Sequence, residues 1–526
     1  MDSNSAPAID PALDPAFSGM SFAEVCALAL RQQTQIKHIS ALNAKMAHEM
    51  AVLKRLKFAA QSEKFRERFS PEQKSLLEEA IDEDLQALER EVGKLNPPAK
   101  QPGEKQVPKR QPLPAHLPRH DIHHEPDSTA CTAPGCGCQM TRIGEDVAEK
   151  LDYEPGRFSV QRHVRGKWAC VRCQTLTQAP VPACVIDKGL ATAGLMAHVV
   201  VAKYIDHQPL YRQEGILGRA GFAVPRSTQA EWIGAIGVEL APLVQAMRQA
   251  LLSRRVLHAD ETPVAMLKPG HGKTHRAYLW SYCTTAWDDI NAVVFDFAES
   301  RAGHNARRFL GINEDGSGGW RGSLICDDYA GYKQVMNAGV TEAGCLAHAR
   351  RKFHELWANH QSTLAEGALK LFGTLYDIER EAKDLPRQER LRMRQTQARP
   401  AADLLHAWLI ANRQKVPDGS ATAKAIDYSL KRWAALMRFV DDADLAADNN
   451  RIENLIRPIA LGRKNWLFAG SLRAGQRAAA IMSLLHTARL NGHEPYAYLK
   501  DVLERLPTQP ASALADLLPY HWKPGA

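Results

Sequence analysis

The sequence lacks a long hydrophobic run. Its longest apolar stretch, residues 189–202, covers about 14 positions and includes His198, whereas a helix that spans a bilayer needs about 20 apolar residues. The N-terminal segment is acidic and has no apolar core of the kind that a secretory signal requires. These two absences argue against a membrane partner and against secretion, and we expect a cytoplasmic protein.

Cysteine is also sparse, with ten residues among 526. In a cytoplasmic protein these are thiols or metal ligands rather than disulfides. Two groups about 30 residues apart, the second a regular CxxC, are typical of one structural Zn²⁺ held by four thiolates. We therefore expect a zinc-ribbon-like module at 121–183. Four of five cysteines would bind the ion, the first ligand being left open: Cys131, Cys136, Cys138, Cys170 and Cys173.

Acidic residues are outnumbered by basic ones. The chain has 67 Lys and Arg against 59 Asp and Glu, a formal net charge of +8 and a pI near 8.9. This balance suits a polyanionic partner but is a weak indication by itself. The apolar fraction of 45% permits sizeable cores. At roughly 150 residues per domain, the length predicts about three or four domains.

The first part of the chain has the composition of helices followed by a linker. We expect a disordered tail at 1–20, a coiled coil or helical hairpin at 21–96, and a proline-rich basic linker at 97–120. A heptad supports the coiled coil, although Glu49 takes one of its positions. Its apolar members are Ile39, Leu42, Met46, Leu53 and Leu56. So short a heptad fits either an oligomer contact or an amphipathic helix that packs on its own domain.

Residues 184–254 are predicted to form a helical domain. Two helices are followed by a third that starts near Arg226, with Ser227 as the expected N-cap. Basic residues lie around the turn between the helices: Lys203, Arg212, Arg219 and Arg226. A helix-turn-helix DNA-binding domain and a helical packing domain explain this pattern equally well.

The pattern changes at residue 255. Three segments rich in β-branched and aromatic residues predict strands at 255–267, 274–285 and 291–300. A helix and a fourth strand ending near residue 327 follow, which indicates an α/β sheet. Residues 345–447 are predicted to be helical. Their arginine-rich part, 387–415, fits either a solvated helix face or a phosphate-contact surface.

Three acidic residues stand out in this region. Asp260 lies inside an apolar strand, and Asp327 ends another. Glu453 lies at the edge of the apolar face of a helix that carries several basic residues. Buried carboxylates are costly unless they are paired or bind a metal. Together the three could hold two Mg²⁺ ions, which prefer oxygen ligands. Taken alone, Glu453 would instead form a surface pair with Arg457.

Several blocks of the sequence resemble the bacterial insertion sequence 66 family of transposases. They include HADETPV, DDYAGY, GCLAHARRKF and DNNRIENLIRPIALGRKNWLFAGS, and the similarity runs from about residue 110 to the C-terminus. The resemblance implies a DDE transposase with a ribonuclease-H-like α/β core and the triad Asp260, Asp327 and Glu453. Where the family often has Asp-Gly, this chain has Asp327-Asp328, and alternation along a strand assigns the ligand to Asp327.

The resemblance completes the expected architecture, an α+β multidomain chain. The catalytic core would comprise 255–344 and 448–495, the helical segment 345–447 would be an insertion, and 496–526 would be a C-terminal element. Cys345 and His348, three residues apart, have the spacing of half a metal site, but we interpret them as structural or active-site packing because no second half is close in sequence.

The implied activity is cleavage at insertion-sequence ends and transfer of the 3′-hydroxyl strands to target DNA with two catalytic Mg²⁺ ions. The partners would be double-stranded DNA, further copies of the chain and accessory proteins of the same element, with the protein on the nucleoid when DNA-bound. Expected DNA contacts are Arg219, Arg226, Arg350, Arg351, Lys352, Arg451, Arg457, Arg463 and Lys464. The alternatives are a zinc-dependent DNA-binding regulator without cleavage activity and a nuclease of the same fold without strand transfer.

Overall fold

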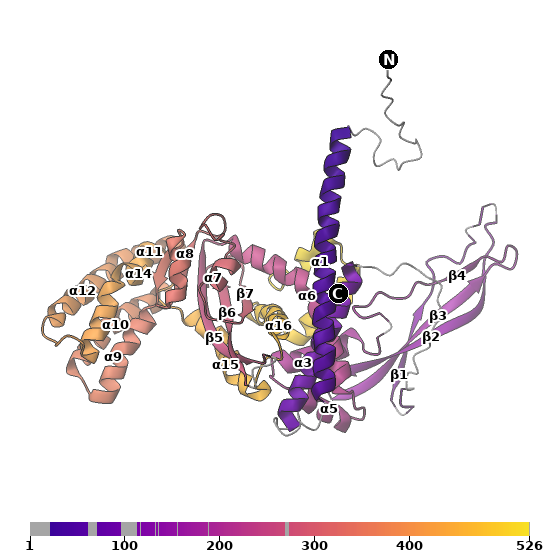
Figure 1. The fold of residues 1–526 in the computed structure, drawn as a ribbon, viewed down its shortest axis with the longest axis horizontal. Coiled ribbons are helices and arrows are strands. Elements are labelled where there is room, and N and C mark those ends of the chain that lie inside the picture. Colours follow the sequence, from indigo (N-terminus) through magenta and orange to yellow (C-terminus); the bar gives the residue numbers. More distant parts are fainter. Residues whose placement is uncertain are drawn as a thin grey trace, which may run out of the picture.

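The computed structural model describes residues 22–60, 71–95 and most of 113–524; within the last range, positions 116, 132, 135, 155, 188 and 269–272 are excepted. The tail expected at 1–20 lies outside the described residues, as does most of the linker expected at 97–120. The described part is a mixed α/β structure whose N-terminal region is helical (Figure 1). Within it, no helix combines the length and apolar character that crossing a bilayer demands.

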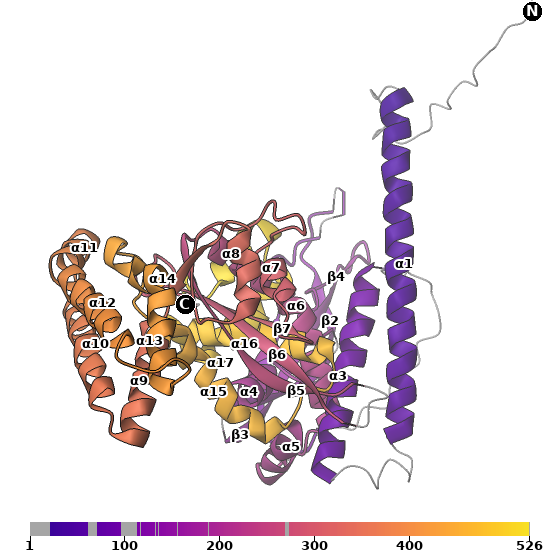
Figure 2. The same cartoon turned by 60° about the vertical axis from the view of Figure 1, so that its left-hand side comes forward.

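Helix α1 (Phe22–Ala60) projects from the body of the molecule (Figures 1 and 2). On its projecting half, Leu30 and Ile36 are each 63% exposed, whereas Met46, nearer the body, is 2% exposed. Glu49, the residue that interrupts the heptad, forms an ion pair with Arg473 of a C-terminal helix at 3.0 Å. Part of α1 therefore packs on its own chain, while an oligomer contact through the projecting half stays a prediction.

Helix α3 (Pro71–Leu95) is embedded in the body rather than standing apart with α1. It lies along the long helix α6 (Arg226–Leu252). The helices approach closely at Gly234, where a Cβ atom would lie 2.4 Å from the carbonyl oxygen of Glu83. Leu88 of α3 is fully buried. The acidic helix thus belongs to the same packed unit as α6.

Residues 119–178 form a four-stranded sheet that extends from the body (Figure 1). Its strands are β1 (Arg119–His124), β2 (Thr141–Glu154), β3 (Arg157–Ala169) and β4 (Leu176–Gln178), in the order β1-β3-β2 with β4 beside β3. The long antiparallel hairpin β2–β3 turns at Gly156, whose φ of +88° favours glycine. The cysteine spacing predicted a zinc module here but gave no sign of this hairpin.

The predicted helices of 184–254 are present. They are α4 (Ala193–Tyr204), α5 (Leu210–Arg219) and α6. Thr192 caps α4 by accepting a hydrogen bond from the backbone N–H of Leu195. The expected cap Ser227 is wrong, because α6 begins at Arg226 and its N-cap position is Pro225, two residues before Ser227. Proline fixes its own φ and suits the residue that leads into a helix.

The central sheet has five strands in the order β7-β6-β5-β8-β9. They are β5 (Val256–Met266), β6 (His275–Thr284), β7 (Val293–Ala298), β8 (Ser323–Cys326) and β9 (Thr341–Gly344). Strands β5 to β7 form an antiparallel meander, and β8 and β9 continue parallel to β5. The four predicted strands are confirmed. The short β9 carried no apolar pattern and was not predicted. Between β7 and β9 lie α7 (His304–Phe309), the 3-10 turn η2 (Ala330–Tyr332) and α8 (Lys333–Asn337).

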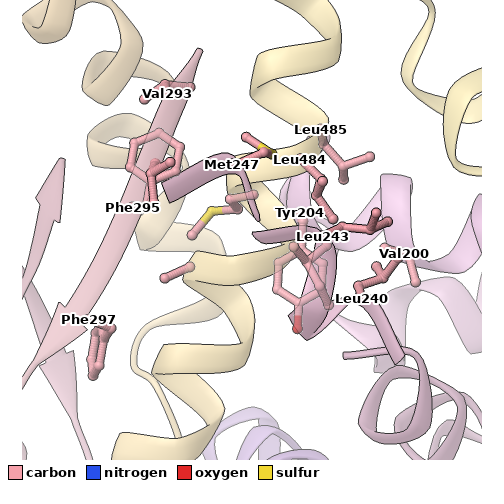
Figure 3. Close-up of a cluster of buried hydrophobic side chains, with 14 of the residues drawn as sticks. Val200, Tyr204, Leu240, Leu243, Met247, Val293, Phe295, Phe297, Leu484 and Leu485 are labelled. Atoms are coloured by element: carbon pink, nitrogen blue, oxygen red, sulfur yellow. The ribbon is translucent and has the colours of Figure 1, made fainter. Parts of the chain in front are cut away.

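Helices α15 (Asn450–Trp466) and α16 (Leu472–Leu490) of the C-terminal part cover this sheet. Helix α17 (Pro495–Arg505) packs on α16 and α4 and is followed by the 3-10 turns η5 (Leu506–Thr508) and η6 (Ala511–Leu517). Helix α16 supplies hydrogen-bond partners to the backbone of the edge strand β7. Ser483 Oγ accepts from the N–H of Phe295 (2.9 Å), and Thr487 Oγ1 bonds to the backbone of Val293. Apolar side chains of α4, α6, β7 and α16 meet in one core (Figure 3).

The helical segment predicted at 345–447 forms a second core beside the sheet (Figure 1). Its elements are α9 (Leu346–His360), α10 (Thr363–Ala382), α11 (Arg387–Met393), the π-helical turn η3 (Arg394–Ala398), α12 (Arg399–Arg413), α13 (Ala421–Lys431), α14 (Trp433–Met437) and η4 (Arg438–Asp441).

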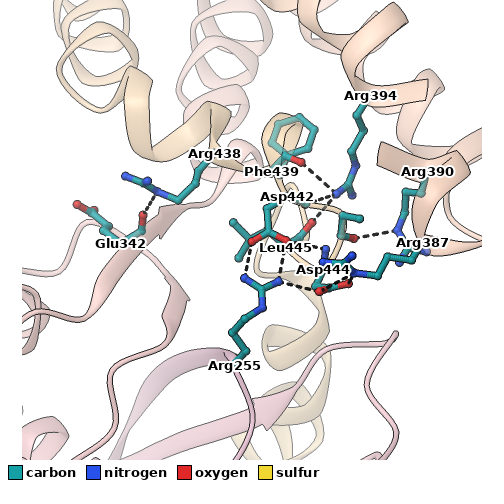
Figure 4. Close-up of polar contacts among 11 residues, drawn as sticks. Arg255, Glu342, Arg387, Arg390, Arg394, Arg438, Phe439, Asp442, Asp444 and Leu445 are labelled. Atoms are coloured by element: carbon teal, nitrogen blue, oxygen red, sulfur yellow. Dashed lines mark hydrogen bonds and ion pairs between the residues drawn. The ribbon is translucent and has the colours of Figure 1, made fainter. Parts of the chain in front are cut away.

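Several arginines of this segment bind protein acceptors (Figure 4). Arg394, fully buried, donates to Glu379 and to the carbonyl oxygens of Phe439, Asp442 and Leu445. Arg387 and Arg255 converge on Asp444. Neither explanation offered for the basic stretch 387–415, a solvated face or a phosphate surface, describes the buried Arg394. Together with Arg387 and Arg255, it holds the loop that leads to α15.

Candidate active site

Two of the predicted acids lie side by side at one end of the central sheet. Strands β5 and β8 run parallel, and His258 is opposite Ile325. Asp260 and Asp327 each follow two residues later, so the register brings them to the same level. Asp260 is still within β5, and Asp327 comes directly after β8.

Asn449 brings the third acid to this place. Its side-chain amide donates to the carbonyl oxygen of Ala259 (2.8 Å), and its Oδ1 lies 2.9 Å from Nδ1 of the buried His258. The residue before α15 is therefore bonded to the two residues of β5 that precede Asp260. Glu453 lies in the first turn of α15, where a carboxylate also suits the positive end of the helix dipole.

Asp327 and Glu453 both lie close enough to Asp260 to affect its ionisation. Burial first, and then the charges of Glu261, Asp327 and Glu453, together raise the pKa of Asp260 to about 8. The one hydrogen bond that favours its charged form comes from the backbone N–H of Glu261 (2.8 Å). A divalent cation at this position would remove the repulsion.

Glu453 has a carboxylate oxygen that the surrounding side chains leave open. Oε1 is buried, has no hydrogen-bond partner among the described residues and lies 3.8 Å from Nδ1 of His348. Oε2 lies 3.6 Å from a guanidinium nitrogen of Arg351. Donor atoms of Cys345, His348 and Glu453 all lie within 4.8 Å of one another. The structure thus brings Glu453 to the Cys345–His348 pair, a neighbour that spacing along the sequence did not reveal. An open carboxylate oxygen fits cation binding.

The two acids adjacent to the triad point to other partners. Asp328 lies 3.5 Å from Nε of Arg432. Glu261, on the opposite face of β5 from Asp260, accepts hydrogen bonds from Arg301 and from Tyr332 (2.7 Å). Both neighbours are engaged within the protein, so the geometry favours Asp260 and Asp327 as cation ligands.

Four cysteines form a separate cluster at the far end of the β2–β3 hairpin. Sγ of Cys131 lies 3.0 Å from that of Cys173, Sγ of Cys136 lies 3.7 Å from that of Cys170, and all four lie within 4.8 Å of one another. Zn–S bonds of about 2.3 Å in a tetrahedron place sulfur atoms about 3.8 Å apart, so the cluster fits Zn²⁺. Cys138 is outside it and donates to the carbonyl oxygen of Cys136.

Comparisons with known proteins show the family of the chain. A model described as "Transposase IS66 family" matches residues 188–477, more than half of the chain. The chain belongs to the IS66 transposase family. Further models match the "IS66 C-terminal element" at 483–520, the "zinc-finger binding domain of transposase IS66" at 129–174 and the "Transposase C of IS166 homeodomain" at 45–122.

Relatives of this IS66-family chain occur in Sinorhizobium fredii. The uncharacterized protein y4jD is 36% identical over 425 residues, which cover 78% of this chain and 81% of the relative. The uncharacterized protein y4qI is 34% identical over 505 residues, which cover 92% and 90%. The zinc-finger match and the cysteine cluster together indicate a zinc site in this family member.

The basic residues expected to contact DNA divide into two groups. Arg451 donates to the carbonyl oxygen of Thr284 and to Asn291, Arg463 donates to Thr262 and Pro263, and Arg226 pairs with Glu78. These three bind protein acceptors. The other six are exposed or half-buried and stay predicted DNA contacts: Arg219, Arg350, Arg351, Lys352, Arg457 and Lys464.

Lys203, which the sequence placed beside a helix-turn-helix, has a structural position instead. It is enclosed between Glu79 (3.5 Å) and Glu83 (3.1 Å) of α3 and cannot reach DNA. Sequence reasoning also missed how Asn449 would act. Asn449 occupies the N-cap position of α15, but its side chain makes no cap hydrogen bond and binds β5 instead.

Proposed function

We propose that this IS66-family chain is a DDE transposase that cleaves insertion-sequence ends and joins them to target DNA. The observation that carries the proposal is that Asp327 and Glu453 both lie near enough to Asp260 to raise its pKa, with one Glu453 oxygen left open. The meander β5–β7, the parallel strands β8 and β9 and the glutamate-bearing α15 support a ribonuclease-H-like core. Residues 345–447 would be its insertion.

The residues present fit two Mg²⁺ ions, since carboxylate oxygens are the ligands that Mg²⁺ prefers. When bound, the ions would stabilise the attacking and leaving oxygens of an in-line phosphoryl displacement. Asp260 and Asp327 would hold them from the sheet and Glu453 from the helix. In cleavage, a water oxygen bonds to phosphorus at the transposon end and a 3′ oxygen leaves. In joining, that 3′-hydroxyl bonds to a target phosphorus and a target 3′ oxygen leaves.

The surface near Glu453 suits a nucleic-acid backbone. A hollow of about 550 Å³ next to the start of α15 is lined by residues that include Arg350, Arg351, Arg380 and Asn450. Cationic side chains in a groove attract phosphates regardless of base sequence. Double-stranded DNA is therefore the proposed substrate, and we further propose a homo-oligomer assisted by other proteins of the element.

A cleavage and joining assay on labelled DNA that carries the element's terminal repeats tests the proposal. We expect Mg²⁺-dependent nicking at the repeat boundary and joined products with target plasmid. Nicking without joining would indicate a nuclease. Repeat binding without nicking would indicate the zinc-dependent regulator. The open triad, which a regulator does not need, favours the transposase.

A further inference from the structure

Arg301, which the sequence analysis did not single out, lies in the loop between β7 and α7 and is fixed beside the carboxylate cluster. Its Nε donates to Oε1 of Glu261 (2.6 Å), and its Nη2 lies 2.5 Å from the same oxygen. The guanidinium carbon lies 3.7 Å from the centroid of the Tyr329 ring. Because the N–H of Tyr329 donates to Asp327 Oδ1 (2.9 Å), one residue connects the arginine to a triad acid.

The groups that hold Arg301 are themselves held in place. Tyr332 Oη donates to the other oxygen of Glu261 (2.7 Å), whose side chain is fully buried. The hydroxyl of Tyr329 donates to the carbonyl oxygen of Arg301. Both the backbone and the guanidinium of Arg301 therefore have a fixed position.

Arg301 keeps donors that the protein does not use. Both of its contacts with a carboxylate go to one oxygen, no acceptor is recorded for Nη1 within the described structure, and 41% of the side chain is exposed. Burial lowers the pKa of Arg301, but Glu261 and Asp327 raise it overall, which places the guanidinium within electrostatic reach of the triad. A purely structural arginine differs: Arg394 is fully buried, and its donors reach four protein groups.

We infer that Arg301 binds a DNA phosphate next to the one being cleaved, on the Asp327 side of the site. The inference rests on the proposed function. A guanidinium offers phosphate two parallel donors, and stacking on Tyr329 sets the plane of that fork. Glu261, Tyr329 and Tyr332 are positioning residues. Arg351, which lies against Glu453 and is 54% exposed, would contact a different phosphate.

The test combines variants with DNA in which single phosphates near the cleavage point are replaced by neutral methylphosphonates. Binding is measured with Ca²⁺ in place of Mg²⁺, and cleavage with Mg²⁺. For wild type, we expect one flanking position at which the neutral group weakens binding about tenfold or more. Arg301→Gln should lose sensitivity at that position and keep it elsewhere. Its kcat/KM on unmodified DNA should fall about a hundredfold.

Three further variants keep the test decisive. Arg301→Lys preserves the charge and the fold but not the fork, so an intermediate loss at the same phosphate is expected. Tyr332→Phe removes one hydrogen bond to Glu261. It should slightly reduce the loss of binding that a neutral group causes at the same phosphate. Arg308→Gln, a control in the next helix whose partner is Asp296, should leave the wild-type profile unchanged.

The inference is overturned if Arg301→Gln and Arg301→Lys, both folded, retain the wild-type sensitivity at every phosphate. The proposed function fails separately, when wild type binds the repeat but never cuts it. In that case the Ca²⁺ binding profile still decides whether Arg301 contacts a phosphate.

Discussion

Two clusters of buried carboxylates, one on α3 and one at the end of the central sheet, differ in the partners that surround them. On α3, Glu83 and Asp84 pair with Arg477 of α16 at 2.9 and 3.0 Å, and Lys203 lies between Glu79 and Glu83. Burial raises the pKa of Glu79 and Asp84 in spite of these cations, whereas Lys203 and Arg477 lower the pKa of Glu83 overall. At the end of the sheet, burial and three neighbouring acids together raise the pKa of Asp260.

This difference in partners distinguishes a structural cluster from a candidate functional site. The α3 cluster contains its own cations, so it can join the N-terminal helix to the core without any added ligand. The triad contains no cation that pairs with Asp260 among the described residues, and Glu453 keeps an open oxygen. Acidic composition is similar in both places, and only the partners distinguish a structural network from a cation site.

The largest difference between the clusters should appear in activity. Asp260→Ala, Asp327→Ala and Glu453→Ala should each reduce cleavage about a thousandfold or more, because each removes a cation ligand. Glu83→Gln should leave the cleavage rate per folded molecule unchanged. The measurement is single-turnover nicking of terminal-repeat DNA, with DNA binding measured in parallel. Equal losses from Glu83→Gln and Asp260→Ala would remove the distinction between the clusters.

Stability should show the reverse order, with a larger loss from a change in the α3 cluster than from a change near the triad. Arg477→Met removes the cation that Glu83 and Asp84 share, and breaking such a buried pair costs about 3–5 kcal/mol. The melting temperature of Arg477→Met should therefore fall strongly. The melting temperature of Arg351→Met, near Glu453, should change little because that arginine is largely exposed. An unchanged melting temperature for Arg477→Met would show that the α3 network is not structural.

The pH dependence of the metal-free protein should also come from the triad. The unfolded carboxyl of Asp260 has a pKa of 3.8, and the folded one about 8. Between these values the folded state holds the extra proton, so its free energy of unfolding falls as pH rises, on the order of a few kcal/mol. Addition of Mg²⁺ at pH 8 should restore the free energy of unfolding that is lost. Urea unfolding of wild type and Asp260→Asn checks this, and identical pH profiles would contradict it.

A smaller effect is expected at the residue that joins the helix to the sheet. Asn449→Ala removes the bonds to His258 and Ala259 and leaves buried groups unpaired, which costs about 1–3 kcal/mol. Misplacement of Glu453 should also lower kcat about tenfold to a hundredfold with little change in DNA affinity. Asn359→Ala, at an exposed position of α9 that does not line the hollow, is the control. A stable Asn449→Ala variant with full activity would show that this contact does not position Glu453.

Local patterns predicted the features that depend on neighbouring residues. Strands β5 to β8 and the helices of the insertion followed from apolar content and its spacing, and the acids were noticed because they interrupt apolar strands. The failures involve distant partners. No residue near Lys203 in the sequence indicates that Glu79 and Glu83 are its partners. The residues around 387–415 likewise do not indicate that Arg394 binds carbonyl oxygens of 439–445. The pairing of Cys131 rather than Cys138 with the other thiols likewise depended on a loop whose path the sequence does not give.

Direct detection of the cation tests the central claim. Crystals of the zinc-loaded protein with terminal-repeat DNA, soaked in Mn²⁺, should show anomalous peaks bounded by Asp260, Asp327 and Glu453. The peaks should be lost in Asp327→Asn and retained in Asp328→Asn. The account would be contradicted if wild type showed no Mn²⁺ peak at this position. It would also be contradicted if the peak were unchanged in Asp327→Asn.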